Sequence, residues 1–292
     1  MGYVLAMNKR ASESRPIRPP VAAAITGRAA EMQKLAQARA SADAEFVAIY
    51  GRRRVGKTFL VREFFGEAIR FELTGMHGVS LVDQLENFAA ALGQAKGLSE
   101  KLQPPGSWRE AFEQLERHME SLPPTVAGSK HVVFLDELPW LDTPRSKFCP
   151  ALEHFWNSWA SRRKDVLLVV CGSAASWMVQ QVVEAKGGLH NRITRRIRLL
   201  PFTLGETAAF LKSRGVDLTP YQVIELYMAV GGVPHYLKMA EPGLSAFQII
   251  DRLCFSPQGE LRVNSTASTP RCSTVPRSIL PSYERWRGNA RG

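Results

Sequence analysis

Residues 51–58 combine glycines, a lysine and a threonine in a spacing that suits a phosphate chain. They are Gly51, Arg52, Arg53, Arg54, Val55, Gly56, Lys57 and Thr58. Glycines let the backbone curl around an anion without Cβ clashes, so that successive N–H groups face it. Lys57 can reach the β- and γ-phosphates, and Thr58 can offer its hydroxyl to Mg²⁺. We therefore expect a P-loop that binds ATP with magnesium, with Phe59 among its nucleotide contacts; a P-loop fold that no longer binds is the alternative.

An apolar run that ends in two carboxylates predicts the metal and water side of the same site. Residues 131–137 read HVVFLDE, which places Asp136 and Glu137 at the end of a strand, with Asp136 79 residues after Lys57. We expect Asp136 to hold Mg²⁺ through its water shell and Glu137 to orient and deprotonate the attacking water. A carboxylate directly after this Asp resembles the additional-strand, catalytic-glutamate class of P-loop proteins. A strand that merely ends in solvated charges is the plainer reading.

The polar residue after the next apolar strand has two compatible interpretations. Residues 166–171 read VLLVVC and are followed by Gly172 and Ser173. In the catalytic-glutamate class the neighbouring strand carries a polar sensor that faces the γ-phosphate, and Ser173 stands at the matching place. Serine is also a favoured N-cap, so Ser173 could simply begin the next helix.

Short apolar segments alternate with helical ones and must position these motifs. Strand signals occur at 46–50, 69–73, 131–136, 166–171 and 196–200. Helical patterns occur at 29–42, 58–66, 80–94, 107–121, 150–162 and 174–185, and after Pro201 at about 205–213, 220–230 and 244–254. Such alternation predicts a parallel sheet with helices on both faces. The expected fold is α/β, a P-loop NTPase of the additional-strand (AAA+-like) type over 25–202, followed by a small helical lid over 203–262.

Composition bounds the cellular context. No apolar run reaches the length of a membrane span, the first residues lack a signal peptide, and the four cysteines are scattered without a CxxC pair. We expect a cytoplasmic protein with no membrane partner. The net charge of +11 is compatible with nucleic acid, but residues 1–20 carry +3 of it and residues 263–292 carry +4, so the body is only mildly basic. Nucleic acid is therefore not indicated.

Five segments in one order resemble a known family, the archaeal-type ATPases, which are also widespread in bacteria and are related to the signal-transduction ATPases with numerous domains. They read FVAIYGRRRVGKTFLVREFF, VVFLDELPWL, VVCGSAASWM, GLHNRITRRIRLLPFTLGE and YMAVGGVPHYL. The resemblance covers about residues 25–262. It implies an AAA+-like ATPase that uses ATP and Mg²⁺.

The resemblance also implies roles for three residues outside the P-loop. Arg28 belongs to a hydrophobic–hydrophobic-Gly-Arg-x-x-Glu box that the family uses near the adenine and at the lid hinge, although Thr26 departs from the pattern. Pro234 belongs to a Gly-x-Pro motif that touches the nucleotide from the lid. Arg192 stands where related ATPases carry an arginine that stabilises γ-phosphate charge, from the same chain or a neighbour. A helix start, a helix-ending turn and a solvated basic turn are the respective plain alternatives. The family is typically arginine-rich at Arg52–Arg54, and we expect these side chains to be partly structural rather than catalytic.

Both ends of the chain lack a packing pattern. We expect residues 1–24 to be a disordered lead-in. From Val263 onward, a reading frame shifted by one base, with free choice among synonymous codons, can read EFDRLYASLFDSAALHPAIVRALARKR, which resembles the family's continuation. We therefore expect residues 263–292 to be an out-of-frame, disordered tail that has replaced the family's C-terminal domain; sequencing an intact G run and this stop codon at the locus would contradict it.

These motifs favour a nucleotide-operated switch that hydrolyses ATP and reports its state to an unknown protein partner. A non-hydrolysing ATP-binding scaffold is the first alternative. A DNA-linked ATPase of a mobile element or defence system is the second, and a small-molecule kinase fits less well because Glu137 suits the activation of water. The sequence leaves the oligomeric state open.

Overall fold

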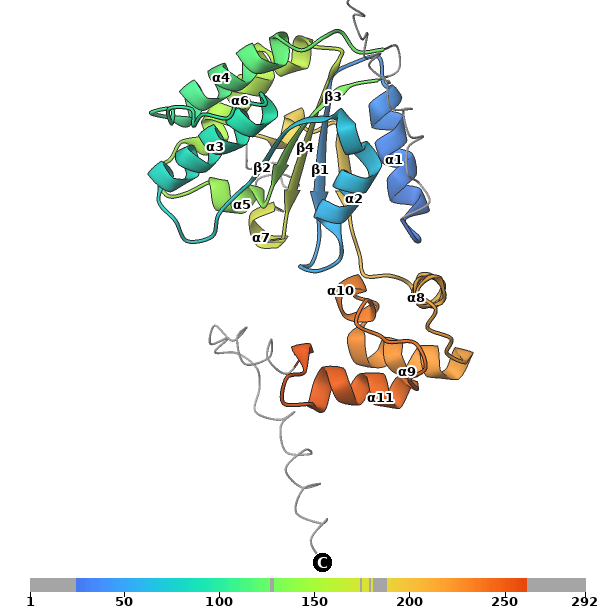
Figure 1. The fold of residues 1–292 in the computed structure, drawn as a ribbon. Helices are drawn as coiled ribbons and strands as arrows, with labels where there is room; N and C mark the ends of the chain where they lie inside the picture. The colour runs from blue at the N-terminus through green and yellow to red at the C-terminus, as the bar shows by residue number, and fades with distance from the viewer. Residues whose placement is uncertain (1–24, 127–128, 174, 179, 181–187, 262–292) are drawn as a thin grey trace, which may run out of the picture.

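The computed structural model describes most of the chain between Ile25 and Leu261 (Figure 1). The described residues are 25–126, 129–173, 175–178, 180 and 188–261. The predictions for residues 1–24 and 263–292 therefore lie outside the described residues, as does most of the helix expected at 174–185. None of the helices in these ranges could cross a membrane.

Five parallel strands form one sheet. They are β1 (Glu45–Tyr50), β2 (Ile69–Thr74), β3 (His131–Asp136), β4 (Val166–Gly172) and β5 (Arg195–Arg198), in the spatial order β2-β3-β4-β1-β5. Every strand predicted from the sequence is present, with bounds that differ by at most two residues. The predicted α/β fold of the additional-strand type is confirmed, because β4 lies between β1 and β3.

Helices cover both faces of the sheet (Figure 1). In chain order they are α1 (Ala29–Ala40), α2 (Lys57–Phe65), α3 (Leu81–Ala95), α4 (Trp108–Glu120), α5 (Leu138–Leu141), α6 (Phe148–Ser158) and α7 (Ala175–Met178). Helices α1 and α2 lie on one face, and α3, α4 and α6 lie on the other. The four-residue helix α5 was not predicted, because Pro139 and the short span give no helical periodicity.

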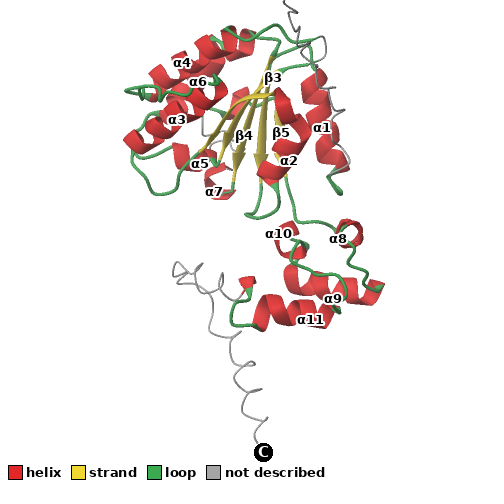
Figure 2. Ribbon diagram, in the orientation of Figure 1, coloured by secondary structure: helices red, strands yellow, loops and turns green. Residues whose placement is uncertain are grey.

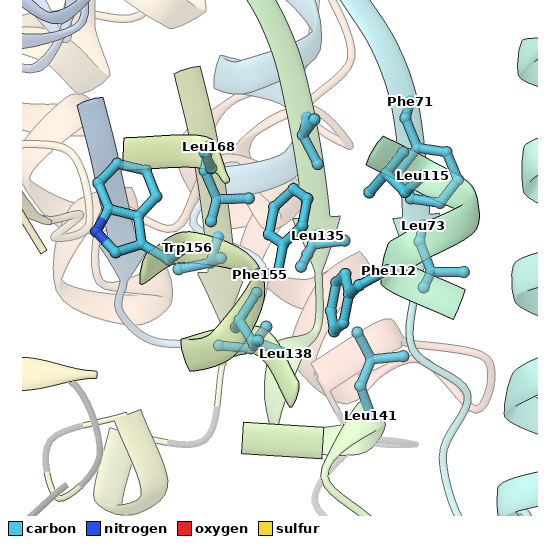
Figure 3. Packing of buried hydrophobic residues seen from close by; sticks show 14 of the residues in the cluster. Phe71, Leu73, Phe112, Leu115, Leu135, Leu138, Leu141, Phe155, Trp156 and Leu168 are labelled. Atoms are coloured by element: carbon cyan, nitrogen blue, oxygen red, sulfur yellow. The ribbon is translucent and has the colours of Figure 1, made fainter. Parts of the chain in front are cut away.

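Side chains of the central strands alternate between two apolar cores. Along β3, Val133 and Leu135 enter the core under α3, α4 and α6, whereas Val132 and Phe134 enter the core under α1 and α2. Strands buried on both faces favour apolar residues at successive positions, which is why residues 132–135 of β3 and 166–171 of β4 read as unbroken apolar runs. The first core is rich in aromatic rings: Phe112 stacks on Phe155 with ring centroids 5.0 Å apart (Figure 3).

The chain then builds a separate helical unit, defined here as residues 203–261. It contains α8 (Leu204–Ser213), α9 (Pro220–Val230), α10 (Pro234–Leu237) and α11 (Ala246–Ile250), the last continued by a π-helical turn, Asp251–Phe255. Capping boxes begin three of these helices, at Thr203, Thr219 and Ser245, because each is followed three residues later by Glu or Gln. The unit has its own apolar core. The sequence pattern missed the short α10, whereas the helix expected at about 244–254 covers α11 and most of the π-helical turn.

The strands point toward this helical unit (Figure 2), so the loops after β1, β3 and β4 face it. The segment that leaves the sheet packs tightly into this unit: the side chain of Phe202 lies in the core of the helical unit, and its N–H donates to the carbonyl of Gly232 at 2.8 Å. A Cβ at Gly232 would lie 2.3 Å from the carbonyl oxygen of Phe202. Glycine at 232 is therefore required by the approach of two backbones.

Two adjacent glycines allow this requirement to be tested. Gly231 and Gly232 have φ of 68° and 66°, but a Cβ at Gly231 would meet nothing within 4 Å. We expect Gly231→Ala to cost about 1 kcal/mol of stability for the left-handed backbone alone. Gly232→Ala should cost at least about 2 kcal/mol more, because the chain must also move. Calorimetric unfolding of both variants measures the difference, and equal losses would contradict the packing argument.

Candidate nucleotide-binding and hydrolysis site

The P-loop is the turn between β1 and α2, and its two glycines serve different purposes. A Cβ at Gly51 would lie 2.2 Å from the carbonyl oxygen of Leu199. The N–H of Leu199 donates to the carbonyl of Tyr50 at 2.8 Å, so glycine at 51 lets the segment after β5 pack against the loop. Gly56 has φ of 92° and precedes the first residue of α2. The left-handed backbone at Gly56 turns the loop into the helix N-terminus, where free N–H groups attract phosphate.

Lys57 is the first residue of α2, and its side chain reaches back across the P-loop. Only 6% of its surface is exposed, and its Nζ donates to the carbonyls of Gly51 and Arg52, each at 3.1 Å. Burial lowers the pKa of Lys57, while the nearby carboxylates of Glu137 and Asp136 oppose that effect. The ammonium therefore sits at the centre of the loop, where a phosphate would complete its coordination.

Asp136 and Thr58 meet at the carboxyl end of β3. The hydroxyl of Thr58 donates to Oδ2 of Asp136 at 2.7 Å, and the N–H of Glu137 donates to Oδ1 at 3.0 Å. Asp136 is 4% exposed, and burial raises its pKa against the effect of those two hydrogen bonds. A buried carboxylate beside a hydroxyl fits Mg²⁺, which binds through few protein oxygens and takes the rest from phosphate and water. No larger group of acidic, histidine or cysteine ligands occurs among the described residues.

Glu137 adopts a backbone conformation that is uncommon for a residue with a side chain. Its φ and ψ are 47° and 46°, at the residue that precedes α5. Such left-handed residues cost free energy and persist where the surrounding structure holds them. The hydroxyl of Ser173 donates to Oε2 of Glu137 at 2.7 Å, which fixes the carboxylate at the site's edge. Ser173 follows β4, the neighbour of β3, so the sheet brings the expected base and the expected sensor into contact.

Arg28 lies at the junction of the sheet and the helical unit. Its side chain donates from Nη2 to the carbonyl of Val55 at 3.2 Å and lies over the ring of Phe202, 4.6 Å from the centroid. Its backbone N–H donates to Oε1 of Glu206 in α8 at 3.0 Å. Burial lowers the pKa of Arg28, and the carboxylates of Glu31 and Glu206 oppose this. One residue therefore links the P-loop to the first helix of the helical unit.

Arg54 makes the second link between the P-loop and the helical unit. Its Nη1 donates to the hydroxyl of Tyr236 in α10 at 3.4 Å and pairs with Oε1 of Glu260 at 3.1 Å. Pro234 begins α10 at the position that suits proline, two residues before Tyr236. The structure thus brings the Gly-x-Pro segment near the P-loop through Tyr236. A direct contact between Pro234 and nucleotide stays a prediction.

Arg192 is not brought to the phosphate side of the site. It precedes β5, and in the pairing with β1 the residues before β5 lie beside Phe46, at the strand end opposite the P-loop. Its guanidinium donates to Oδ1 of Asn157 at 2.9 Å and to the carbonyl of Gly188. This position does not support a role for Arg192 within its own chain. A role from a neighbouring copy stays a prediction.

The remaining predicted contacts differ in burial. Val55 is buried in the core beside α2, so only its backbone is available to a phosphate. Phe59 is 52% exposed on the first turn of α2. Sequence reasoning missed the partners of the P-loop arginines, Tyr236, Glu260 and Trp140, because nothing in their local pattern marks them. Glu206 could have been found, since the Thr203–Glu206 capping box predicts the start of α8.

Together these features define a P-loop NTPase of the additional-strand type: a P-loop after β1, the two acids Asp136 and Glu137 after β3, and the polar Ser173 after the intervening β4. The chain belongs to a family of ATPase domains found predominantly in Archaea, which matches residues 25–240. It is therefore an ATPase domain, and the predicted family is confirmed.

Solved structures share the fold at low sequence identity. The Walker-type ATPase of Pyrococcus abyssi matches with a TM-score of 0.54 and 19% identity, over 74% of this chain and 66% of that one. The ORC2 protein of Aeropyrum pernix, in ADPNP–ADP complexes, matches with a TM-score of 0.51 and 17% identity, over 77% and 67%. An uncharacterized protein of Methanocaldococcus jannaschii is 24% identical over 208 residues; the match covers 71% of this chain but only 42% of that relative's length.

The buried carboxylate of Asp136 predicts a pH-dependent stability. Because its pKa is raised in the folded state, the native chain binds a proton there more tightly than the unfolded chain does. Stability should therefore fall as the pH rises from the unfolded pKa through the folded one, and the full cost is present at neutral pH. Asp136→Asn, which can keep both hydrogen bonds, should raise the unfolding temperature of the nucleotide-free protein at pH 7, with a smaller gain near pH 4.

The control removes an equal charge from an exposed position. Glu86 lies on the outer face of α3, so Glu86→Gln should not raise the unfolding temperature more at pH 7 than near pH 4. Thermal unfolding scans of the three proteins between pH 4 and pH 7 measure the effect. A neutral-pH stability of Asp136→Asn at or below that of the parent would contradict a costly buried charge.

Proposed function

We propose that this domain hydrolyses ATP with Mg²⁺ and that its nucleotide state sets the position of the helical unit. The proposal rests chiefly on one observation, the direct hydrogen bonding between the P-loop and the helical unit through Arg28 and Arg54. A loop that holds phosphate and also holds the next unit can transmit the presence of the γ-phosphate.

The side chains around β1, β3 and β4 suit hydrolysis. In the proposed reaction Glu137 takes a proton from a water molecule, the water oxygen bonds to the γ-phosphorus, and the bond to the β–γ bridging oxygen breaks to leave ADP and phosphate. Lys57 and the N–H groups of the loop bind the β- and γ-phosphates. Thr58 and Asp136 would hold the Mg²⁺ that neutralises developing charge on the phosphates. Ser173 orients the carboxylate of Glu137 by its 2.7 Å hydrogen bond.

The proposed switch has two arms. Arg28 is nearly fully buried, so movement of the Val55 carbonyl on phosphate binding would act on Arg28 and through it on Glu206. Arg54 has a left-handed backbone with φ of 70°, so a rearrangement of the loop would redirect its side chain away from Tyr236 and Glu260. Contacts that differ between two loop conformations are what a ligand needs in order to shift a population.

Hydrolysis is tested at the expected base. Glu137→Gln should lower turnover by about 10²- to 10⁴-fold while ATP binding persists, because the amide cannot accept the water proton. Lys57→Ala should lose binding as well. Phosphate release with and without Mg²⁺, beside equilibrium binding of ATP, separates the two effects. Unchanged turnover in Glu137→Gln would contradict hydrolysis by this residue, and ATP binding without turnover in the parent would favour the scaffold alternative.

The second arm of the switch is tested from the helical side. Tyr236→Phe removes the hydroxyl that accepts from Arg54 but keeps the ring, and Glu260→Gln removes the ion pair. We expect hydrogen exchange of α10 to differ between the ADP and ATP-analogue states of the parent, and the double variant to lose most of that difference. Tyr221→Phe makes the same chemical change on the exposed face of α9 and serves as the control. Equal hydrogen-exchange rates of α10 in the ADP and ATP-analogue states of the parent protein would contradict the switch.

A further inference from the structure

The three consecutive P-loop arginines point to three different surroundings. Arg54 reaches the helical unit. Arg52 is exposed, and its side chain makes no hydrogen bond or ion pair within the described part of the chain. Arg53 instead faces the residues after β3 and β4, where hydrolysis would occur. Identical side chains in one loop therefore have unequal environments, and that of Arg53 is the one next to the reacting groups.

Two neighbours hold the guanidinium of Arg53. Its Nε donates to the hydroxyl of Ser173 at 3.4 Å, and its Cζ lies 5.3 Å from the ring centroid of Trp140. Ser173 in turn donates to Glu137, and the N–H of Trp140 donates to the carbonyl of Glu137 at 2.9 Å. Both neighbours of Arg53 thus contact Glu137 directly. A guanidinium over an aromatic face is stabilised by the ring quadrupole while its edge stays available for hydrogen bonds.

The charge of Arg53 reaches the phosphate side of the loop. After burial and the nearby acids, Arg53 is among the groups that act on the pKa of Lys57, and it lowers it. Only the Nε of Arg53 is engaged in a hydrogen bond among the described residues, so the two terminal nitrogens keep their N–H donors. The exposed guanidinium of Arg53 thus lies against Ser173 and Trp140, close enough to Lys57 to act on its charge, and its terminal N–H donors remain available to a ligand.

We propose that Arg53 binds the γ-phosphate from within the P-loop and stabilises the charge that develops there, with Trp140 and Ser173 as its positioning residues. This inference rests on the proposed hydrolysis. It supplies from the chain's own P-loop a positive charge that Arg192 of the same chain does not bring to the phosphate side. Arginine suits the task because its planar fork matches phosphate oxygens, which lysine cannot do.

A binding experiment that involves no turnover tests the proposal first. AMP-PNP carries a γ-phosphate that is not hydrolysed, and ADP lacks one. We expect Arg53→Ala to weaken AMP-PNP binding by about tenfold or more and to change ADP binding by less than about threefold, measured by titration calorimetry with Mg²⁺. Arg53→Lys should recover only part of the loss. Equal weakening for both nucleotides would overturn the proposal.

Arg52→Ala removes the same charge from the same loop and separates specific contact from general attraction. We compare the ratio of AMP-PNP affinity to ADP affinity in the two variants. If Arg52→Ala lowers this ratio as much as Arg53→Ala does, the proposal is overturned. Arg109→Ala on the outer surface of α4 is the control for loss of an exposed arginine. Circular dichroism of each variant checks that it folds, and Arg53→Lys covers the case in which Arg53→Ala does not.

Turnover then tests the stabilisation of charge. We expect Arg53→Lys to lower kcat by about 10²-fold or more with a smaller effect on KM, because the geometry matters most in the transition state. Trp140→Phe should lower kcat less, and Trp140→Ala more. An unchanged kcat in Arg53→Lys would overturn the catalytic part of the proposal. The two proposals can fail separately. If the parent protein prefers AMP-PNP over ADP through Arg53 but shows no turnover that depends on Glu137, the proposed hydrolysis is contradicted and γ-phosphate binding by Arg53 still stands.

Discussion

The buried carboxylate of Asp136 is the constraint around which the site is arranged. It stands at the end of a strand that is apolar on both faces, and a charge there is costly unless hydrogen bonds and a cation offset the burial. Thr58 and the N–H of Glu137 supply the hydrogen bonds. The strands are parallel and β4 separates β1 from β3, so all three residues lie at the carboxyl edge of the sheet. The strand order therefore sets the arrangement of the candidate site.

Arginines connect this edge to the rest of the chain. Arg28 joins the P-loop to α8, Arg54 joins it to α10, and Arg53 joins it to the residues around Glu137. Each guanidinium has several donors in a fixed plane, which lets one side chain hold a carbonyl, an acid and an aromatic face at once. The P-loop is therefore connected both to the residues around Glu137 and to the helical unit, which is what the proposed mechanism requires.

Much of the architecture was predictable because it depends on local patterns. The five strands follow from apolar runs such as 131–136 and 166–171, and most helices follow from periodicity and capping residues such as Thr203 and Thr219. The short helices α5 and α10 were missed, because four residues have too little periodicity to stand out. Arg192 lies at the amino end of β5, away from the P-loop of its own chain, so its expected role from a neighbouring copy stays a prediction that a single chain cannot test.

The sequence by itself determined the phosphate loop, the two acids after β3 and the parallel α/β class, because spacing within a loop and alternation of apolar segments depend on neighbours close along the chain. Only the tertiary structure decided which of three adjacent arginines contacts Ser173, which residues bridge the P-loop and the helical unit, and that Ser173 contacts Glu137. Those contacts join residues 36 to 206 positions apart, such as Ser173 with Glu137 and Arg54 with Glu260. Their partners are set by strand order and by the approach of backbones at Gly51 and Gly232, which local patterns do not encode.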